Sequence, residues 1–465
     1  MPRLIVGNTR TDGMVGDLTA LSPPEREYAG CAALRLLWYA RSGDVVVLPM
    51  LPRPDFLAYV TSLTGTDPDS LDLLAPPPGE LGAGLLTPDR TAEPGFHQRL
   101  AAAVRQRSIA EVLVVYQDTA VAQLVQSLGL RLPGHAFSAE GGDGILNSKA
   151  GFRAIAAGAG APIVPGLATT RPDRAIELVT RLLAAGHSAI VKREFCCGSN
   201  GNEILSPVAG VRVAGAQRAV LLTDAAAVAD YFGRRWDWLT IGGRYQVVIE
   251  QYLTDCDTVY SEYLVGDDGP QLLGVAEILM SPMPVGEIAP AQALPAAART
   301  VLIEAGTRIA RAFQAIGYRG FVSTDAVLTP SGQIFITEAN ARMSGSTHLH
   351  VVIRDRVLQT AHRDSRLLLE IHGWSVPSFA AAVARLAGTG LAFDRETGIG
   401  VMLTTDQMPD GTVTYCVVAE DLRSAKAIEG RLSTLFAFAT DESATAVDGY
   451  GPFADAVSRP GRLPD

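Results

Sequence analysis

The sequence FVSTDAVLTPSGQIFITEANAR, residues 321–342, decides the fold prediction. Two runs rich in β-branched and aromatic residues flank Thr329-Pro330-Ser331-Gly332, where Pro in second and Gly in fourth position favour a type I turn. The pattern therefore predicts a β-hairpin. With Thr329 opposite Gly332, Asp325 lies opposite Ile336, in a register that a bulge would shift.

The hairpin gathers polar side chains on one face. Side chains alternate along a strand, so Asp325, Glu338 and Asn340 share a face. Two carboxylates and an amide oxygen inside apolar strands are costly unless a cation neutralises them, and oxygen ligands favour Mg²⁺ or Mn²⁺. Arg342 follows two residues later, where its guanidinium fork suits a phosphate.

The alternative is a solvated hairpin whose acids face water. The same alternation places Ile334 and Ile336 on the face of Glu338. This placement favours the metal site over the solvated hairpin.

Composition excludes several classes of protein. The 465 residues are 48% hydrophobic and 19% charged, as in ordinary globular chains of two to four domains. A net charge of −10 argues against a nucleic-acid partner, and no apolar run reaches the length of a membrane span. The first ten residues lack the pattern of a secretory signal, and five cysteines form neither a disulfide framework nor a zinc pattern. We expect a cytoplasmic protein without membrane or nucleic-acid partners.

Lysine is rare in this chain. Of 39 basic residues only Lys149, Lys192 and Lys426 are lysines. A mobile point charge suits a phosphate that is being transferred, which makes Lys149 and Lys192 candidates, whereas Lys426 is expected on the surface. The alternative is that a composition bias left three lysines by chance.

Residues 1–140 alternate between strand-like and helix-like runs, which predicts an open α/β domain. The expected strands are 4–6, 45–48 and 112–116, and the expected helices are 25–41 and 96–107. The loop 7–13 follows the first strand but lacks GxGxxG spacing, so dinucleotide binding is weakly indicated and a structural connection is at least as good an explanation.

The middle of the chain holds a second group of candidates. Asn147 or Ser148 can cap a helix that carries Lys149 in its first turn, where an anion would use both the lysine and the helix dipole. Strand 189–192 carries Lys192 and leads into the loop 198–201, whose backbone amides can approach a phosphate. A plain hairpin turn is the alternative for this loop.

Strand 245–250 leads into a polar-apolar segment that can offer backbone groups to an adenine, or simply connect two strands. Further on we expect a helix over 295–316, strands over 398–403 and 411–418, and a helix over 421–435. The tail, residues 451–465, is expected to be loosely held.

In this order the motifs resemble the ATP-grasp superfamily of carboxylate–amine ligases over roughly residues 140–365. The resemblance implies an N-terminal pre-ATP-grasp α/β domain (1–140) and an ATP-grasp fold of two α+β subdomains (about 141–250 and 251–365). A small α+β C-terminal domain (366–465) follows, and a homodimer is the usual assembly.

The resemblance also assigns roles to residues, with ATP and Mg²⁺ (or Mn²⁺) as cofactors. The phosphate contacts would be Lys149, Lys192 and Arg342, with the last two absorbing charge on the transferred group, and the mobile glycine loop would be Gly198, Ser199, Asn200 and Gly201. The adenine hinge would be Glu250, Gln251, Tyr252 and Leu253, and the acid that binds the ribose would be Asp257. The metal ligands would be Asp325, Glu338 and Asn340. Arg193 departs from the Pro of many members, which leaves the path of that strand open.

The flanking regions resemble the peptide ligase of pheganomycin biosynthesis and its relatives. That resemblance implies joining the carboxylate of an unusual amino acid to the amino group of a peptide or amino acid through an acyl phosphate. Ser344, Gly345, Ser346 and His348 lie just past the metal strand and are candidates to hold the acyl donor or deprotonate the amine. For His348 and His350, however, polar surface is the commoner reading of a histidine in a loop.

Three rival functions are also compatible with the sequence. One is a non-catalytic ATP-binding module, which should lack a metal ligand. Another is a different ATP-grasp chemistry, such as a carboxylase or a nucleotide-pathway ligase. The third is an oxidoreductase centred on the N-terminal domain, against which the missing glycine fingerprint weighs.

Overall fold

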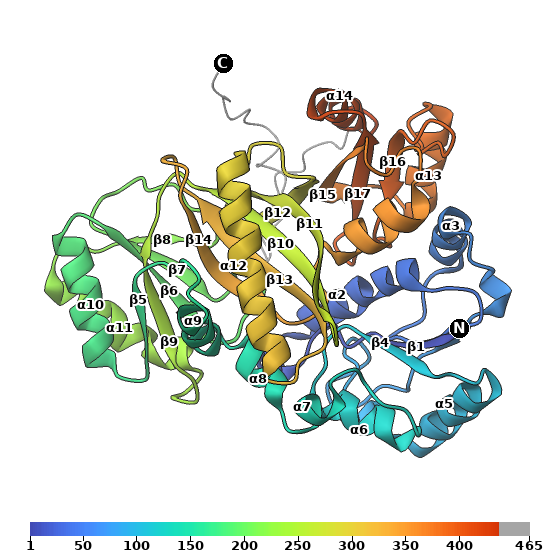
Figure 1. Ribbon diagram of the computed structural model, residues 1–465, viewed down its shortest axis with the longest axis horizontal. Coiled ribbons are helices and arrows are strands. Elements are labelled where there is room, and N and C mark those ends of the chain that lie inside the picture. Colours follow the sequence, from blue (N-terminus) through green and yellow to red (C-terminus); the bar gives the residue numbers. More distant parts are fainter. Residues whose placement is uncertain (437–465) are drawn as a thin grey trace.

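The computed structural model describes residues 1–436 and contains three β-sheets (Figure 1). The predicted tail (451–465) and the end of the predicted C-terminal domain (437–465) lie outside the described residues. The arrangement is mixed α/β, as predicted. Within residues 1–436, none of the helices combines the length and the apolar character needed to cross a membrane.

The N-terminal sheet is parallel, with the strand order β3-β2-β1-β4. Leu4 and Ile5 are fully buried and point into different cores, as expected for a central strand covered on both faces. The strands are β1 (Arg3–Val6), β2 (Val45–Val47), β3 (Asp72–Leu74) and β4 (Glu111–Val114). The helices are α1 (Asp12–Val15), α2 (Pro23–Ala33), α3 (Pro54–Thr64), α4 (Pro88–Thr91), α5 (Pro94–Gln106) and α6 (Thr119–Ser127), with 3-10 helices at Leu18–Ala20, Leu34–Tyr39 and Pro68–Ser70.

A five-stranded sheet forms the next part of the chain, with the order β5-β9-β6-β7-β8. Its strands are β5 (Gly166–Thr169), β6 (Ser188–Arg193), β7 (Asn202–Ser206), β8 (Ala219–Leu221) and β9 (Val247–Tyr252). Helices α10 (Pro172–Ala184) and α11 (Ala225–Thr240) cover one face, with Val191 and Ile249 in the shared core (Figure 1). Because side chains alternate, Lys192 and Glu250 point to the opposite face, away from these helices.

Three short helices lead from the N-terminal domain to this sheet: α7 (His135–Ala139), α8 (Gly142–Asn147) and α9 (Lys149–Gly158). Ser148 is the N-cap of α9, and its hydroxyl accepts from Gly151 N at 2.9 Å. The predicted cap and the predicted place of Lys149 in the first turn are confirmed.

The largest sheet is antiparallel and has eight strands, in the order β14-β13-β10-β11-β12-β15-β17-β16. They are β10 (Asp257–Gly266), β11 (Gly269–Met280), β12 (Pro284–Ala289), β13 (Gly320–Leu328), β14 (Ile334–Asn340), β15 (Leu367–Ser375), β16 (Gly400–Leu403) and β17 (Thr412–Ala419). Helix α12 (Ala296–Ala315) lies across one face of this sheet and packs through Leu302 and Ile309 (Figure 1).

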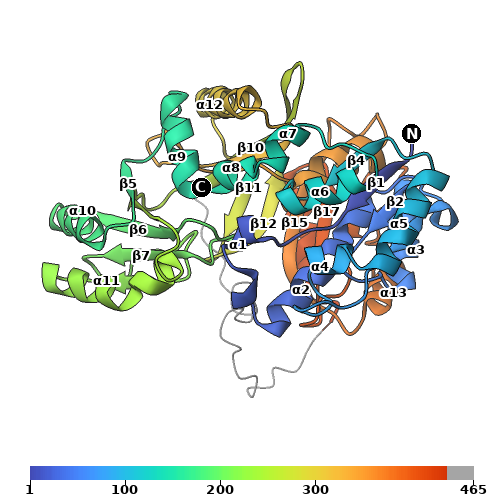
Figure 2. The same cartoon turned by 90° about the horizontal axis from the view of Figure 1, so that it is seen from below.

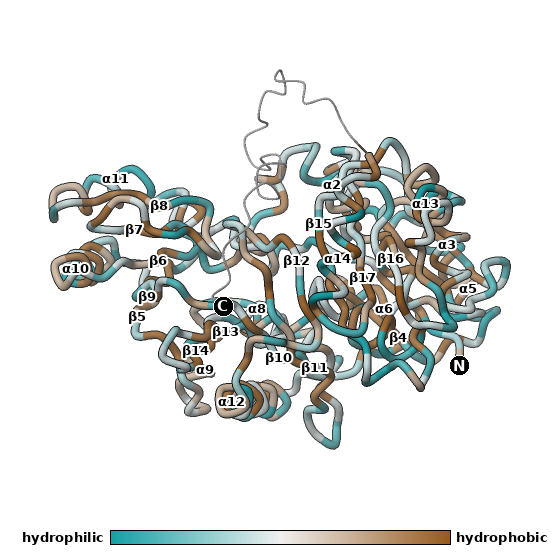
Figure 3. The backbone as a smooth tube through the Cα atoms, turned by 90° about the horizontal axis from the view of Figure 1, so that it is seen from above, coloured by the Kyte–Doolittle hydropathy of each residue, from teal (hydrophilic) through white to brown (hydrophobic). Residues whose placement is uncertain are grey.

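The C-terminal strands continue the sheet that carries the predicted metal hairpin. Helices α13 (Phe379–Gly388) and α14 (Leu422–Leu432) accompany them, after a π-helix over Leu349–Val357. Trp38 of the N-terminal domain is fully buried in the same core and donates to Thr404 O at 3.0 Å, and Phe56 meets Phe379 edge-on. The two ends of the described chain are therefore packed side by side (Figure 2). Hydrophobic residues follow many of the strands, whereas the outer helices alternate between hydrophobic and hydrophilic residues (Figure 3).

The hairpin forms as predicted, but its register differs. Gly332 N donates to Thr329 O at 2.8 Å, which closes the predicted turn. The first pair is Leu328 with Ile334, and a bulge then makes Asp325 the direct partner of Glu338 instead of Ile336. The bulge also reverses the alternation, so Ile334 and Ile336 pack in the α12 core with Ala339 and Ala341. The prediction that these isoleucines share a face with Glu338 is wrong.

Candidate active site

The face of β13 and β14 that points away from α12 carries the predicted acidic cluster. Asp325 and Glu338 are directly opposite each other. Asn340 Nδ2 donates to Asp325 Oδ2 at 3.1 Å, and Ser323 Oγ donates to Asp325 Oδ1 at 2.9 Å. The structure thus brings the three residues together, as the hairpin predicted.

Cations surround the acidic cluster. Lys149 Nζ lies 3.0 Å from Glu338 Oε1 and donates to Cys196 O at 2.9 Å. Arg342 is held by Asn147, whose Oδ1 accepts from Arg342 Nη1 at 2.7 Å. Residues from α8, α9 and β14 therefore meet at one point.

The two carboxyl groups differ in pKa. Burial, and then the charge of Glu338, raises the pKa of Asp325 to about 6, although two hydrogen bonds favour its charged form. Burial also raises the pKa of Glu338, but three nearby cations, Lys149 the strongest, outweigh burial and leave that pKa below its ordinary value. The nearby cations therefore favour the charged form of Glu338, whereas burial and the charge of Glu338 favour the protonated form of Asp325.

Lys192 belongs to a second charged group. Its Nζ lies 2.6 Å from Glu250 Oε2 and donates to Thr337 O at 3.3 Å, and Arg153 pairs with the other oxygen of Glu250. All three side chains are largely buried, with two positive charges for one negative charge. A buried surplus of positive charge favours an anion close by.

The glycine loop connects β6 and β7. Gly198 and Ser199 have positive φ values, +60° and +65°, and Asn202 N donates to Ser199 O at 3.0 Å. A Cβ on Gly201 would lie 2.6 Å from the Cβ of Cys196, so the turn requires glycine there. Arg193, where the family pattern has Pro, is within β6, and its N donates to Gly201 O at 2.9 Å.

The predicted hinge lies at the end of β9. Gln251 N donates to Pro165 O at 3.2 Å, and the Tyr252 hydroxyl donates to Arg212 O at 3.0 Å. Leu253 follows the strand, and Asp257 is the exposed first residue of β10.

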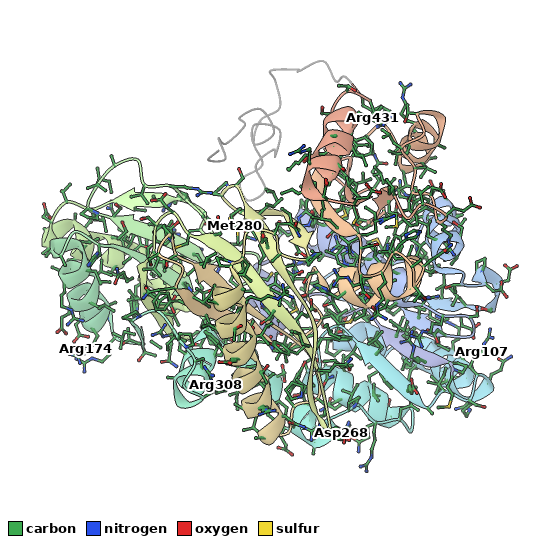
Figure 4. The ribbon with its side chains drawn as sticks, turned by 45° about the horizontal axis from the view of Figure 1, so that its top comes forward. Arg107, Arg174, Asp268, Met280, Arg308 and Arg431 are labelled. Carbon is green, nitrogen blue, oxygen red and sulfur yellow. The ribbon has the colours of Figure 1, made fainter. Side chains whose placement is uncertain are left out.

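A cavity of about 1070 Å³, the central cavity, joins the glycine loop to the acidic cluster. It extends between the N-terminal domain, the hairpin of β11 and β12, and the C-terminal strands; Met280 marks the end of β11 in Figure 4. Five of the eight methionines of the chain line it: Met14, Met280, Met283, Met343 and Met408. The hinge residues 250–253 and Asp257 do not line this cavity.

The segment after Arg342 lines the cavity with Ser344, Gly345 and Ser346. Both serine hydroxyls donate to Glu262, at 3.2 and 3.0 Å, so they are engaged within the protein. The interpretation of His348 as surface is wrong, because it is fully buried with Nε2 2.8 Å from Glu370 Oε1. His350 is buried too, 3.1 Å from the Tyr260 hydroxyl.

The sequence prediction missed several residues that face or support this cavity. Arg35 and Glu287 line it, and Arg153 and Glu262 organise the charged groups beside it. A signal existed for two of them: Arg35 interrupts the apolar run LRLLW, and Glu287 interrupts PVGEIA. A charged residue inside an apolar element is usually buried for a reason.

The donor set fits a hard divalent cation. Asp325, Glu338 and Asn340 offer oxygen ligands on one face, and two carboxylates leave room for phosphate and water oxygens, as Mg²⁺ prefers. Within residues 1–436, no group of three or more His, Cys, Asp or Glu side chains forms a separate metal cluster.

Comparison with known proteins now places the fold. A family model described as Pre ATP-grasp domain matches residues 33–130, and one described as PGM1 C-terminal domain matches residues 381–432. The structure is similar to the ADP complex of purK, N5-carboxyaminoimidazole ribonucleotide synthetase (TM-score 0.53, 13% identity, 92% of this chain and 95% of that chain). The chain has the ATP-grasp fold.

Two further structures have this ATP-grasp fold. They are the biotin carboxylase of Campylobacter jejuni (TM-score 0.55, 13% identity, 91% of this chain and 89% of that chain) and the biotin carboxylase domain of Hydrogenobacter thermophilus 2-oxoglutarate carboxylase with MgADP and bicarbonate (TM-score 0.56, 13% identity, 93% and 89%). No curated protein matches the sequence. The ATP-grasp fold, with a pre-ATP-grasp domain before it and a small C-terminal domain after it, agrees with the prediction.

Proposed function

We propose that this protein is an ATP-dependent ligase. It activates a carboxylate as an acyl phosphate and joins it to an amino group, with release of ADP and phosphate. One observation carries the proposal: Asp325, Glu338 and Arg342 line a cavity that the glycine loop also lines, and Lys149 contacts Glu338 at 3.0 Å. Acids and cations side by side suit a metal-bound polyphosphate, which carries both kinds of charge.

In this proposal the protein positions the nucleotide and neutralises charge. Lys149, Lys192 and Arg342 contact the phosphates, and the buried surplus of positive charge around Glu250 supports the place of Lys192. Loop 198–201 covers the phosphates and excludes water, which would hydrolyse the acyl phosphate. Mg²⁺ on Asp325, Glu338 and Asn340 would stabilise the charge of the transferred group when bound. Residues 250–253 and Asp257 would take the adenine and the ribose.

The two substrates belong in the rest of the central cavity. Its volume exceeds what one amino acid needs, and its methionine-lined wall suits side chains of varied shape. We therefore propose that the substrates are the carboxylate of a non-proteinogenic amino acid and the amine of a peptide or amino acid.

The experiment is a screen for ADP release with ATP, Mg²⁺ and pools of amino acids and short peptides, followed by the mass of the product. A product equal to acid plus amine minus water supports the proposal. Similar folds occur in structures named as a biotin carboxylase and as N5-carboxyaminoimidazole ribonucleotide synthetase, so bicarbonate forms a second arm. ADP release that requires bicarbonate, or nucleotide binding without turnover in any pool, would refute the proposal that this protein is a peptide ligase.

A further inference from the structure

One carboxylate of the central cavity stands apart from the acidic cluster. Glu287 of β12 lines the cavity with 9% of its surface exposed, and its Oε2 accepts from the Tyr260 hydroxyl at 3.1 Å. Within residues 1–436 it forms no ion pair. Its other oxygen, Oε1, accepts no hydrogen bond within this part of the chain. Oε1 is also not one of the fully buried atoms without a partner, so part of its surface is accessible. That oxygen therefore faces the cavity.

Two neighbouring carboxylates show how unusual this is. Glu262 accepts hydrogen bonds from three hydroxyls, those of Ser344, Ser346 and Thr347. Glu370, which is opposite Glu287 in the sheet, is bound by His348 and Thr404. Burial and the charges of these two acids raise the pKa of Glu287. Among the three, Glu287 is the carboxylate left to interact with a ligand, and its surroundings favour a partner that brings a positive charge or a proton.

Its position suits a second substrate. Glu287 is on β12, three strands from Asp325 on β13, which is about 14 Å across the sheet. Tyr260 lies between them, opposite Asp325 in register and hydrogen-bonded to Glu287. A Cβ on Gly345 would lie 4.0 Å from both Glu287 Oε1 and Arg35 Nη1, so loop 344–346 passes between an anion and a cation at this end of the cavity.

We propose that Glu287 is the catalytic residue that binds the ammonium group of the amine substrate and accepts its proton. This role depends on the proposed ligase function. The amine arrives as R–NH₃⁺ and gives one proton to the Glu287 carboxylate, which later passes it to water. The neutral nitrogen attacks the acyl carbon, the C–N bond forms, and the C–O bond to phosphate breaks. The nitrogen loses its second proton to the departing phosphate, which leaves as HPO₄²⁻.

Two half-reactions separate this role from a structural one. With the acid that gives the strongest ADP release, hydroxylamine traps the acyl phosphate as a hydroxamate. Hydroxylamine is uncharged at neutral pH and needs no base. Glu287→Gln should form hydroxamate within about threefold of the wild-type rate and lose about 100-fold or more in amide formation with the natural amine. Glu287→Asp should recover part of the amide rate.

Glu277→Gln is the matched control. Glu277 is on the neighbouring strand β11 and does not line the cavity. It accepts hydrogen bonds from two backbone N–H groups, which the amide oxygen of glutamine can also accept. In Glu277→Gln, hydroxamate formation and amide formation should both stay at the wild-type rate. Equal loss of hydroxamate and amide in Glu287→Gln, or an unchanged amide rate, would overturn the role of Glu287. Absence of hydroxamate and amide in the wild type would instead overturn the proposed function, and this role with it.

Discussion

Replacing Lys149 by methionine tests the proposed phosphate site, and the chain has few other lysines that could compensate for the loss. Lys149 Nζ contacts Glu338 Oε1 at 3.0 Å and Cys196 O at 2.9 Å, and its side chain is 5% exposed. Methionine has a similar length and no charge, so it keeps the packing of α9 and removes one cation from the site. Asn147 still holds Arg342 beside the acids in this variant.

The expected loss follows from one charge-assisted contact. Such a contact contributes about 1.5–3 kcal/mol, which corresponds to a fall of about 10- to 150-fold in kcat/KM for ATP. The assay is ADP release at varied ATP with the other substrates saturating, and circular dichroism checks the fold.

Lys426→Met is the matched control, because Lys426 is exposed on α14, where it pairs with Glu429 at 2.8 Å. Its kcat/KM should equal that of the wild type. An unchanged kcat/KM in Lys149→Met, or an equal fall in both variants, would refute the reasoning.

Three further predictions follow from the same geometry. Asp325→Asn and Glu338→Gln should each abolish turnover and leave the circular dichroism spectrum unchanged, and near-normal turnover in either would contradict the metal assignment. Gly201→Ala should raise KM for ATP, because its Cβ would collide with Cys196 and distort the glycine loop, whereas Gly430→Ala on α14, which has open space, should not; equal KM values would refute the tight turn. Burial, opposed by the hydroxyls of Thr347, Ser346 and Ser344, raises the pKa of Glu262 to about 7. As the pH rises, Glu262 therefore loses its proton at a lower pH in the unfolded chain than in the folded protein. The free energy of unfolding of the wild type should fall by up to about 3 kcal/mol relative to Glu262→Gln between about pH 5 and pH 8. Thermal midpoints of both proteins at the two pH values check this, and a constant difference would contradict it.

Local signals in the sequence were enough to predict much of the site. The turn at 329–332 and the alternation of β13 and β14 predicted the shared face of Asp325 and Glu338. Likewise, Ser148 before an apolar-periodic run predicted the cap of α9. These features depend on residues close together in the chain, where turn and capping chemistry act directly.

Features that depend on distant pairings were not predictable in this way. The bulge that makes Asp325 the partner of Glu338 has no mark in the sequence, and it moved Ile336 to the other face. Similarly, His348 is buried because β15 places Glu370 against it, 22 residues away. The apolar run around Glu287 could indicate a buried charge, but it could not indicate that the sheet places Glu287 opposite Glu370 and beside the cavity.

A titration with a non-hydrolysable ATP analogue, with and without Mg²⁺, tests the proposed nucleotide site most directly. In the proposed function the nucleotide lies between Lys149, Lys192 and the acids of the hairpin. Its binding should depend on Mg²⁺ and should weaken in Lys192→Met and Glu338→Gln but not in Lys426→Met. Equal affinity in all four proteins, or binding indifferent to Mg²⁺, would contradict the proposed site.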